Sequence, residues 1–388
     1  MEPRVVTGLG ICSAIGIGRD AFFRALETPV LLRDKTSQPI ESFDASKYEG
    51  AAVAEVRDFD PAKYLGDKGL RTLDRLTKLL VVATRIGTTD AGLKKDNAFV
   101  PPATPDRVGV VCSNAYGSLE AITELNRVAT LEDARYINPA KFPNTVANSA
   151  SGYASIWEEL RALNVAVSDG NCGALDAVGC ADVHFASGRA DALLVGGAEA
   201  ASEALYVAFH RLGMLEAGAA LGEGAALLAL ERKAFADKRG ARALAEVVGF
   251  GTAFEAPDSD TQMIFASTLA MTRAIRSCLE DASLEPSAID LVASGLSGLK
   301  PFDTVELAAI NEVLGKDACI AMPKALVGET LGAGGAMAMA CALGWLQGIA
   351  PAAVISGKTP AKVKTVLVTT MGYYGNASAV ILRASDRT

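Results

Sequence analysis

The fold is decided by the stretch Asn164-Val-Ala-Val-Ser-Asp-Gly-Asn-Cys-Gly-Ala-Leu-Asp-Ala-Val-Gly-Cys-Ala-Asp-Val-His-Phe-Ala-Ser-Gly188. Its first half alternates apolar and small residues at strand spacing, and its second half repeats apolar residues at helical spacing. We therefore expect a strand that runs directly into a helix. At the join, Gly170 permits a tight turn and Asn171 is expected to cap the helix. Such an elbow presents one side chain to a substrate, backed by backbone N–H groups and the positive end of a helix.

Strand and helix patterns alternate on both sides of this elbow. Apolar, often β-branched runs predict strands at residues 4–11, 108–112, 192–195, 225–231 and 243–250. Amphipathic periodicity predicts helices at residues 71–91, 260–282 and 304–313. Residues 138–155, with two prolines and a run of small residues, are expected to form a loop that leads into a close-packed helix. The alternation predicts an α/β fold with a mostly parallel sheet and helices on both faces.

The composition argues against several classes of partner and site. A formal net charge of -8 over 388 residues disfavours nucleic acid and anionic membranes as partners. The seven cysteines lack a C-x-x-C pair, so they predict buried thiols in a reducing compartment, without a disulfide framework or a metal site. We find no signal-peptide pattern and no apolar run long enough to span a bilayer. A cytoplasmic protein is therefore expected.

Motifs spread along the chain resemble the β-ketoacyl synthases of the thiolase superfamily. They are Val5-Val-Thr-Gly-Leu-Gly-Ile, Ser42-Phe-Asp-Ala-Ser, Leu73-Asp-Arg-Leu-Thr-Lys, Arg107-Val-Gly-Val-Val, Gly196-Gly-Ala-Glu-Ala, Leu221-Gly-Glu-Gly-Ala, Lys324 and Gly332-Ala-Gly-Gly, together with the elbow. The resemblance implies that family's duplicated five-layer αβαβα fold. It divides the chain into an N-terminal half, residues 1–248, and a C-terminal half, residues 249–388.

The resemblance also shows which catalytic groups have been replaced. The family's elbow reads Val-Ser-Thr-Ala-Cys-Ala-Thr-Gly, and an ungapped alignment puts Asn171 on the nucleophilic cysteine. The family's His-Gly-Thr appears as Ser294-Gly-Leu-Ser, and its Lys-Ser-x-x-Gly-His as Lys324-Ala-Leu-Val-Gly-Glu329. Lys324 is retained, but the cysteine and both histidines are gone. An amide, a hydroxyl and a carboxylate cannot perform thioester formation and malonyl decarboxylation as those groups do. No catalytic residue is therefore expected.

Structural roles are favoured for the other reactive side chains. Glu306 and Lys324 keep the family's identity and are expected to form an internal ion pair, with Asp303 beside them. His184 and His210 match no catalytic motif, so we expect structural roles. Cys172 is the alternative nucleophile, because a helix N-terminus would lower its thiol pKa. With no histidine adjacent in the sequence, a buried inert thiol is favoured.

Two further departures concern the acyl pocket. The segment between Arg211 and Leu221 lacks the family's Arg-Pro-Phe-Asp, which shortens a loop near the pocket. The C-terminal motif Phe-Gly-Phe-Gly-Gly-Thr-Asn appears as Met371-Gly-Tyr-Tyr-Gly-Asn-Ala. Tyr373 at this gate is expected either to narrow the pocket or simply to pack in the core with its hydroxyl bonded. The resemblance also suggests Tyr116, Phe142 and Tyr153 as residues that line a substrate tunnel.

Joint loss of three groups on an intact scaffold favours a subunit kept for packing or binding. The chain most resembles the chain-length factors of type II polyketide systems, including those that make aryl polyenes. That resemblance implies a heterodimer with a catalytic ketosynthase, access to acyl carrier protein through the pair, and no cofactor. Two alternatives remain open: a stand-alone acyltransferase or β-ketoacyl-acyl-carrier-protein synthase that uses Cys172, and a purely structural homodimer.

Overall fold

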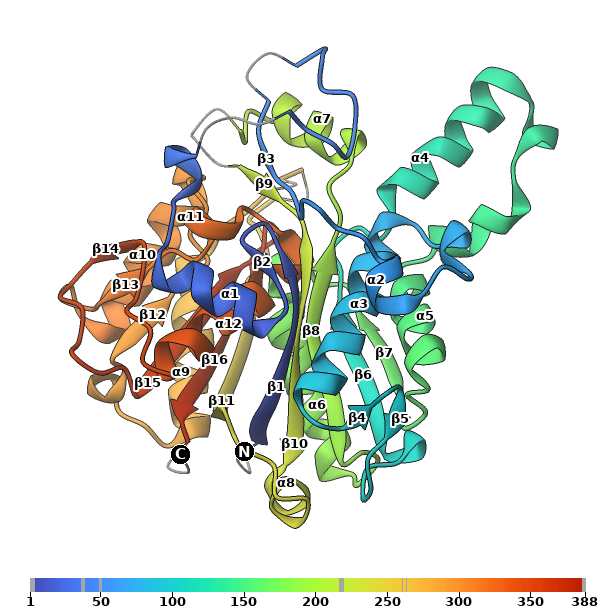
Figure 1. The fold of residues 1–388 in the computed structure, drawn as a ribbon. Helices are drawn as coiled ribbons and strands as arrows, with labels where there is room; N and C mark the ends of the chain where they lie inside the picture. Colours follow the sequence, from blue (N-terminus) through green and yellow to red (C-terminus); the bar gives the residue numbers. More distant parts are fainter. Residues whose placement is uncertain are drawn as a thin grey trace.

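Two halves with the same strand order build one twelve-stranded sheet in the computed structural model (Figure 1), which describes residues 4–35, 39–48, 51–215, 220–259, 261–262 and 264–385. The N-terminal half has the order β7-β6-β8-β10-β1, and the C-terminal half repeats it as β13-β12-β15-β16-β11, with β14 at its edge. The bounds are β1 (Arg4–Ser13), β6 (Val108–Ser113), β7 (Asn164–Val167), β8 (Ala192–Glu199), β10 (Gly224–Arg232), β11 (Ala245–Phe254), β12 (Leu291–Ala293), β13 (Ile320–Ala321), β14 (Val354–Ser356), β15 (Thr365–Met371) and β16 (Asn376–Ala384). This repeat confirms the duplicated fold. Position 248 lies within β11, so the exact division between the halves stays a prediction.

The sheet is mixed, so the prediction of a mostly parallel sheet was wrong. β7, β6 and β8 run parallel, as do β13, β12 and β15. The pairs β8–β10, β10–β1, β15–β16 and β16–β11 are antiparallel, and β1 joins β11 antiparallel through residues 4–6. A short connection such as the β15–β16 hairpin returns the chain in the opposite direction, whereas parallel strands need a helical crossover. Strand periodicity carries no information about direction.

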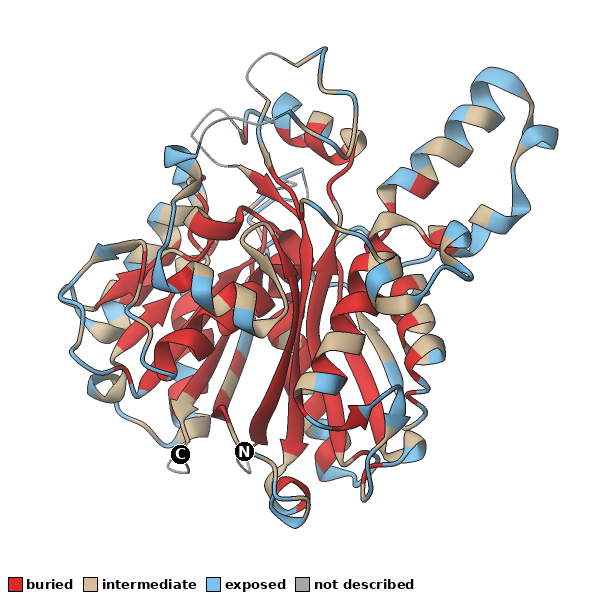
Figure 2. Cartoon of the chain, in the orientation of Figure 1, coloured by how far each residue is buried: buried red, intermediate tan, exposed pale blue. Residues whose placement is uncertain are grey.

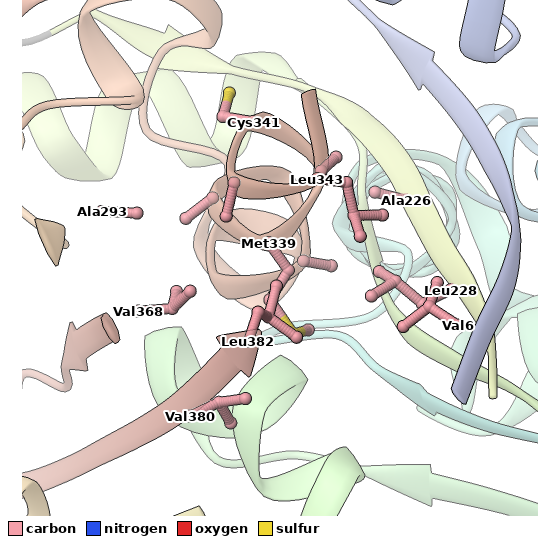
Figure 3. Close-up of a cluster of buried hydrophobic side chains, with 14 of the residues drawn as sticks. Val6, Ala226, Leu228, Ala293, Met339, Cys341, Leu343, Val368, Val380 and Leu382 are labelled. Atoms are coloured by element: carbon pink, nitrogen blue, oxygen red, sulfur yellow. The ribbon is translucent and has the colours of Figure 1, made fainter. Parts of the chain in front are cut away.

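Helices complete five layers. α6 (Gly173–Ala186) and α12 (Gly334–Leu346) lie between the two halves of the sheet; α3 (Arg75–Asp90) and α5 (Ser149–Glu158) cover the N-terminal half, and α9 (Thr268–Ala282) and α10 (Lys300–Leu314) the C-terminal half. Figure 3 shows Met339, Cys341 and Leu343 of α12 among side chains from both halves of the sheet. Every residue of α12 is buried, which its uncharged sequence of small and apolar residues permits.

Capping side chains explain where two helices begin. The Asp74 carboxylate accepts a hydrogen bond from the Thr77 N–H, so α3 starts at Arg75 rather than at 71. The Ser267 hydroxyl accepts from the Ala270 N–H, so α9 starts at Thr268 rather than at 260, a residue outside the described ranges. The backbone just before α9 instead bridges to the β15–β16 turn.

The remaining elements lie around this frame. They are α1 (Arg19–Glu27), α2 (Ala62–Leu65), α4 (Leu119–Val128), α7 (Glu203–Arg211), α8 (Lys233–Lys238), α11 (Lys324–Val327), β2 (Gly16–Ile17), β3 (Val53–Ala54), β4 (Lys94–Lys95), β5 (Ala98–Phe99) and β9 (Leu221–Gly222). α4 and the irregular turns that follow it, residues 119–145, form an arm that projects from the body (Figure 2). Leu131, Tyr136 and Phe142 on this arm are exposed.

Within the described part of the chain, no helix combines the length and the apolar character needed to cross a bilayer.

Candidate functional site

The predicted elbow forms, and it buries Asn171. β7 ends at Val167, Gly170 has the positive φ of 54° that the tight turn requires, and α6 begins at Gly173. Asn171 is 3% exposed and does not cap the helix, because Cys172 occupies the cap position without a side-chain cap bond. The capping prediction was therefore wrong. The Asn171 side chain interacts instead with the Tyr373 hydroxyl, and its Oδ1 has no hydrogen-bond partner.

Cys172 is a poor nucleophile. Its thiol is fully buried, and its Sγ lies 3.5 Å from the Thr370 carbonyl oxygen. Burial, followed by the nearby charges of Asp176 and Asp169, raises the pKa of the thiol well above its ordinary value. The sequence favoured a buried thiol over one activated by the helix N-terminus, and the thiol is buried. Desolvation outweighs the helix dipole here, so the thiol stays protonated near neutral pH.

Glu329, at the position of the family's second histidine, is paired inside the protein. Its Oε2 lies 2.6 Å from Nζ of Lys324, and its Oε1 accepts a 2.9 Å hydrogen bond from the Leu331 N–H. Glu329 is 3% exposed and Lys324 is 6% exposed. Each charge therefore compensates the desolvation of the other. The predicted Lys324–Glu306 pair was wrong, because the Lys324 ammonium binds Glu329.

Ser294 and the two acids near it are held by local hydrogen bonds. The fully buried Ser294 hydroxyl donates to the Ala321 carbonyl oxygen at 2.7 Å. Glu306 accepts from the Gly295 N–H and the Thr369 hydroxyl, both at 2.7 Å, while burial raises the pKa of its carboxyl to about 7. Asp303 accepts from the Ser297 and Gly298 N–H groups. These groups fix the backbone beside the site, and Ser294 has no free hydroxyl proton to offer.

Tyr373 closes the cluster from the turn between β15 and β16. It is 7% exposed, its hydroxyl lies 3.4 Å from Glu329 Oε2, and its ring packs edge-on against Phe302 at 4.8 Å between centroids. Burial and then the Glu329 charge raise the pKa of Tyr373 well above its ordinary value. The core-packing interpretation of Tyr373 agrees with this environment, whereas narrowing of an acyl pocket stays a prediction.

The nominated tunnel residues lie in different environments. Tyr116 is 37% exposed and hydrogen-bonds Tyr374, Tyr153 of α5 is half-buried against the N-terminal core, and Phe142 is 63% exposed on the arm. Their tunnel role stays a prediction. Tyr374 was not predicted as a site residue, although it is a tyrosine where the family motif has glycine.

The two histidines lie on other elements. His184 belongs to the last turn of α6, and the exposed His210 of α7 stacks on the ring of Tyr206 at 6.1 Å between centroids. The shortened loop falls partly outside the described residues. All seven cysteines are free. In the described ranges, no group of three or more His, Cys, Asp or Glu side chains is placed to hold a metal ion.

The cluster of Asn171, Lys324, Glu329 and Tyr373 differs from the cysteine and two histidines of the resembled family. It offers neither a thiolate to accept an acyl group nor an imidazole to steady an enolate. The Glu329 carboxylate would repel an enolate, and three donors already occupy most of its acceptor positions.

Comparisons with known proteins agree across the chain. The model of the β-ketoacyl synthase N-terminal domain matches residues 1–236, and that of the C-terminal domain matches residues 244–354. A 3-oxoacyl-[acyl-carrier-protein] synthase 2 of Coxiella burnetii is 30% identical over 365 residues, covering 87% of this chain and 84% of that protein. The structure of the ishigamide ketosynthase/chain length factor superposes with a TM-score of 0.88 at 25% identity, covering 99% of both chains. A ketosynthase (ApeO) in complex with its chain length factor (ApeC) from Xenorhabdus doucetiae shares the fold, with a TM-score of 0.79 at 18% identity over 99% of this chain and 98% of that one.

Proposed function

The chain belongs to the β-ketoacyl synthase family, and we propose that it is a chain-length-factor-like subunit that shapes the acyl tunnel of a partner ketosynthase in type II polyketide or polyene biosynthesis. In this role it performs no condensation of its own. Acyl carrier protein reaches the pair through the partner.

One observation supports this proposal above the others: the Lys324–Glu329 ion pair. Here the carboxylate at the second histidine position is bonded to Lys324, to a backbone N–H and to the gate tyrosine. A buried carboxylate is tolerated only with such partners. The site has been rebuilt as protein interior, which fits a subunit retained for its surface and not for its chemistry.

The face that meets the partner is proposed on the β7 side. Among the strands that the structure describes, β7 ends the sheet and pairs only with β6, so its outer backbone groups are proposed to pair with the partner. On the same half, Ile156 of α5 is 72% exposed, and on the arm Leu131 is 74% exposed and Phe142 63%. These exposed apolar side chains are proposed as part of the surface that meets the partner. The ishigamide structure, a ketosynthase/chain length factor, agrees with this assignment of the partner's class.

Co-purification tests the pairing. We expect Phe142→Asp to reduce recovery of a co-expressed ketosynthase at least about tenfold, because a charge would be desolvated in an apolar contact. The measurement is the ratio of the two subunits after affinity purification through this chain.

Ile355→Asp is the matched control, since Ile355 is 50% exposed on β14 at the opposite edge of the sheet. Equal recovery of the ketosynthase with both variants would contradict the proposed face. Recovery of this chain as a soluble monomer indifferent to the synthase would contradict the heterodimer itself.

Product length tests the tunnel. Tyr116, Phe142, Tyr153 and Tyr373 are proposed to line it, and Tyr116 is the best probe because it is half-buried near the site and outside the ion pair. We expect Tyr116→Ala to lengthen the products of the reconstituted pair while the partner's turnover stays within about twofold, because a smaller side chain leaves more room for the acyl chain. An unchanged product distribution with Tyr116→Ala and also with Tyr116→Trp would remove the tunnel role.

The alternative function, acyl transfer through Cys172, requires a covalent acyl mass on this subunit. The buried thiol with its raised pKa argues against it. Intact-mass measurement after incubation with acyl carrier protein thioesters decides between the two functions, because the chain-length-factor proposal allows acylation only of the partner.

A further inference from the structure

The turn between β15 and β16, residues 372–375, covers the elbow that carries Asn171 and Cys172. Cys172 Sγ contacts the Thr370 carbonyl oxygen just before this turn. Just after it, Asn376 Nδ2 donates to the Asp169 carbonyl oxygen at 3.2 Å. The turn and the elbow are therefore bonded to each other on both sides of Tyr373, and Cys172 of the elbow has no exposed surface.

The Tyr373 hydroxyl lies between Asn171, at the family's nucleophile position, and Glu329, at the family's second-histidine position. It lies 3.4 Å from Glu329 Oε2, a long hydrogen bond, and it interacts with the Asn171 side chain. Glu329 is itself held by Lys324 and by the Leu331 N–H. A continuous chain of polar contacts thus runs from Asn171 through Tyr373 and Glu329 to Lys324.

The ring and backbone of Tyr373 are also fixed. Phe302 and Phe209 contact the ring edge-on at 4.8 and 6.2 Å between centroids. The Phe265 N–H donates to the Tyr373 carbonyl oxygen at 2.8 Å, and the Gly375 N–H donates to the Phe265 carbonyl oxygen at 2.9 Å. An outward swing of the turn would break these bonds and leave a buried carboxylate with one fewer donor.

We propose that Tyr373 is a latch that holds the 372–375 turn closed over Asn171 and Cys172 by linking Asn171 to the Glu329–Lys324 pair. The latch makes the residues at the former nucleophile and second-histidine positions depend on each other. A hydroxyl at 373 needs the acceptor at 329, and a carboxylate at 329 needs its donors. The latch acts within this chain alone, so it holds whether or not a ketosynthase is the partner.

Cys172 provides a direct test, because it is a fully buried thiol in the elbow to which the turn is bonded. The full-length chain is treated with iodoacetamide under native conditions, and alkylation of Cys172 is followed by peptide mass spectrometry relative to Cys341, which is fully buried in α12. We expect Tyr373→Phe to raise the Cys172-to-Cys341 ratio about fivefold, the effect of one lost hydrogen bond on an opening equilibrium. Tyr373→Ala should raise it further.

Tyr206→Phe is the matched control, since Tyr206 is a tyrosine of similar burial in the same aromatic cluster, and its ratio should equal that of the wild type. Normalisation to Cys341 removes any contribution from global unfolding. A wild-type ratio in both Tyr373 variants would overturn the latch, since the turn would then be closed by packing elsewhere. The readout needs neither partner nor acyl carrier protein, so its failure is distinct from failure of the proposed function.

Discussion

Replacing Glu329 by histidine, the residue that the family carries there, is expected to lower the free energy of unfolding by about 3–5 kcal/mol. The substitution removes the carboxylate from a nearly fully buried ion pair and leaves the Lys324 ammonium uncompensated. Adding Asn171→Cys and Ser294→His should not create condensing activity. Ser294 has no exposed surface, so an imidazole there would overpack the core instead of facing a substrate. Urea denaturation measures the first effect, and an assay with malonyl and acyl carrier protein measures the second.

The double variant Lys324→Met/Glu329→Met separates the ion pair from its surroundings. Because both charges leave together, we expect it to recover most of the lost stability. If Glu329→His alone matches the wild type within about 0.5 kcal/mol, a margin typical of exposed sites, then the pair does not stabilise the rebuilt site. Measurable condensation by the triple variant would show that the catalytic pocket is still formed.

Replacing Glu158 by alanine is expected to lower the free energy of unfolding by about 3–5 kcal/mol. Glu158 has no exposed surface, and its carboxylate bonds Arg85 of α3 at 2.6 Å and Lys94 of β4 at 3.0 Å. Lys94 is 3% exposed, so the substitution leaves a buried ammonium without its carboxylate partner. These bonds also fix the end of α5, the helix that carries Tyr153 and Ile156. We therefore expect weaker pairing with the ketosynthase as well, measured by co-purification.

Glu132→Ala is the control for this prediction. Glu132 pairs with Arg127 on the arm, where both side chains are about half exposed, so its loss should change stability by less than about 0.5 kcal/mol. Thermal and urea denaturation of both variants compare the two pairs. Equal effects at Glu158 and Glu132 would mean that burial does not determine the contribution of these ion pairs.

The sequence predicted the local chemistry at several positions correctly. The strand, the Gly170 turn and the helix of the elbow follow from periodicity and from the conformational freedom of glycine. The motifs indicated the family, the duplicated fold and the three replaced catalytic groups.

Two of the wrong predictions depended on contacts between residues distant in the sequence. Strand direction was missed because alternation of apolar residues is the same in parallel and antiparallel pairs. The Asn171 cap failed because its amide meets Tyr373, about two hundred positions away. The burial that the sequence favoured for Cys172 also depends on such contacts, because the folded chain desolvates the thiol and raises its pKa.

By itself, therefore, the sequence determined the family, the duplicated α/β fold and the absence of a Cys-His-His set, because these depend on the identity and local spacing of residues. Only the tertiary structure decided that Lys324 neutralises Glu329 and that Tyr373 closes the site. The partner of a buried charge depends on distance and on desolvation. Both are set when α11, the segment after it and the β15–β16 turn pack together.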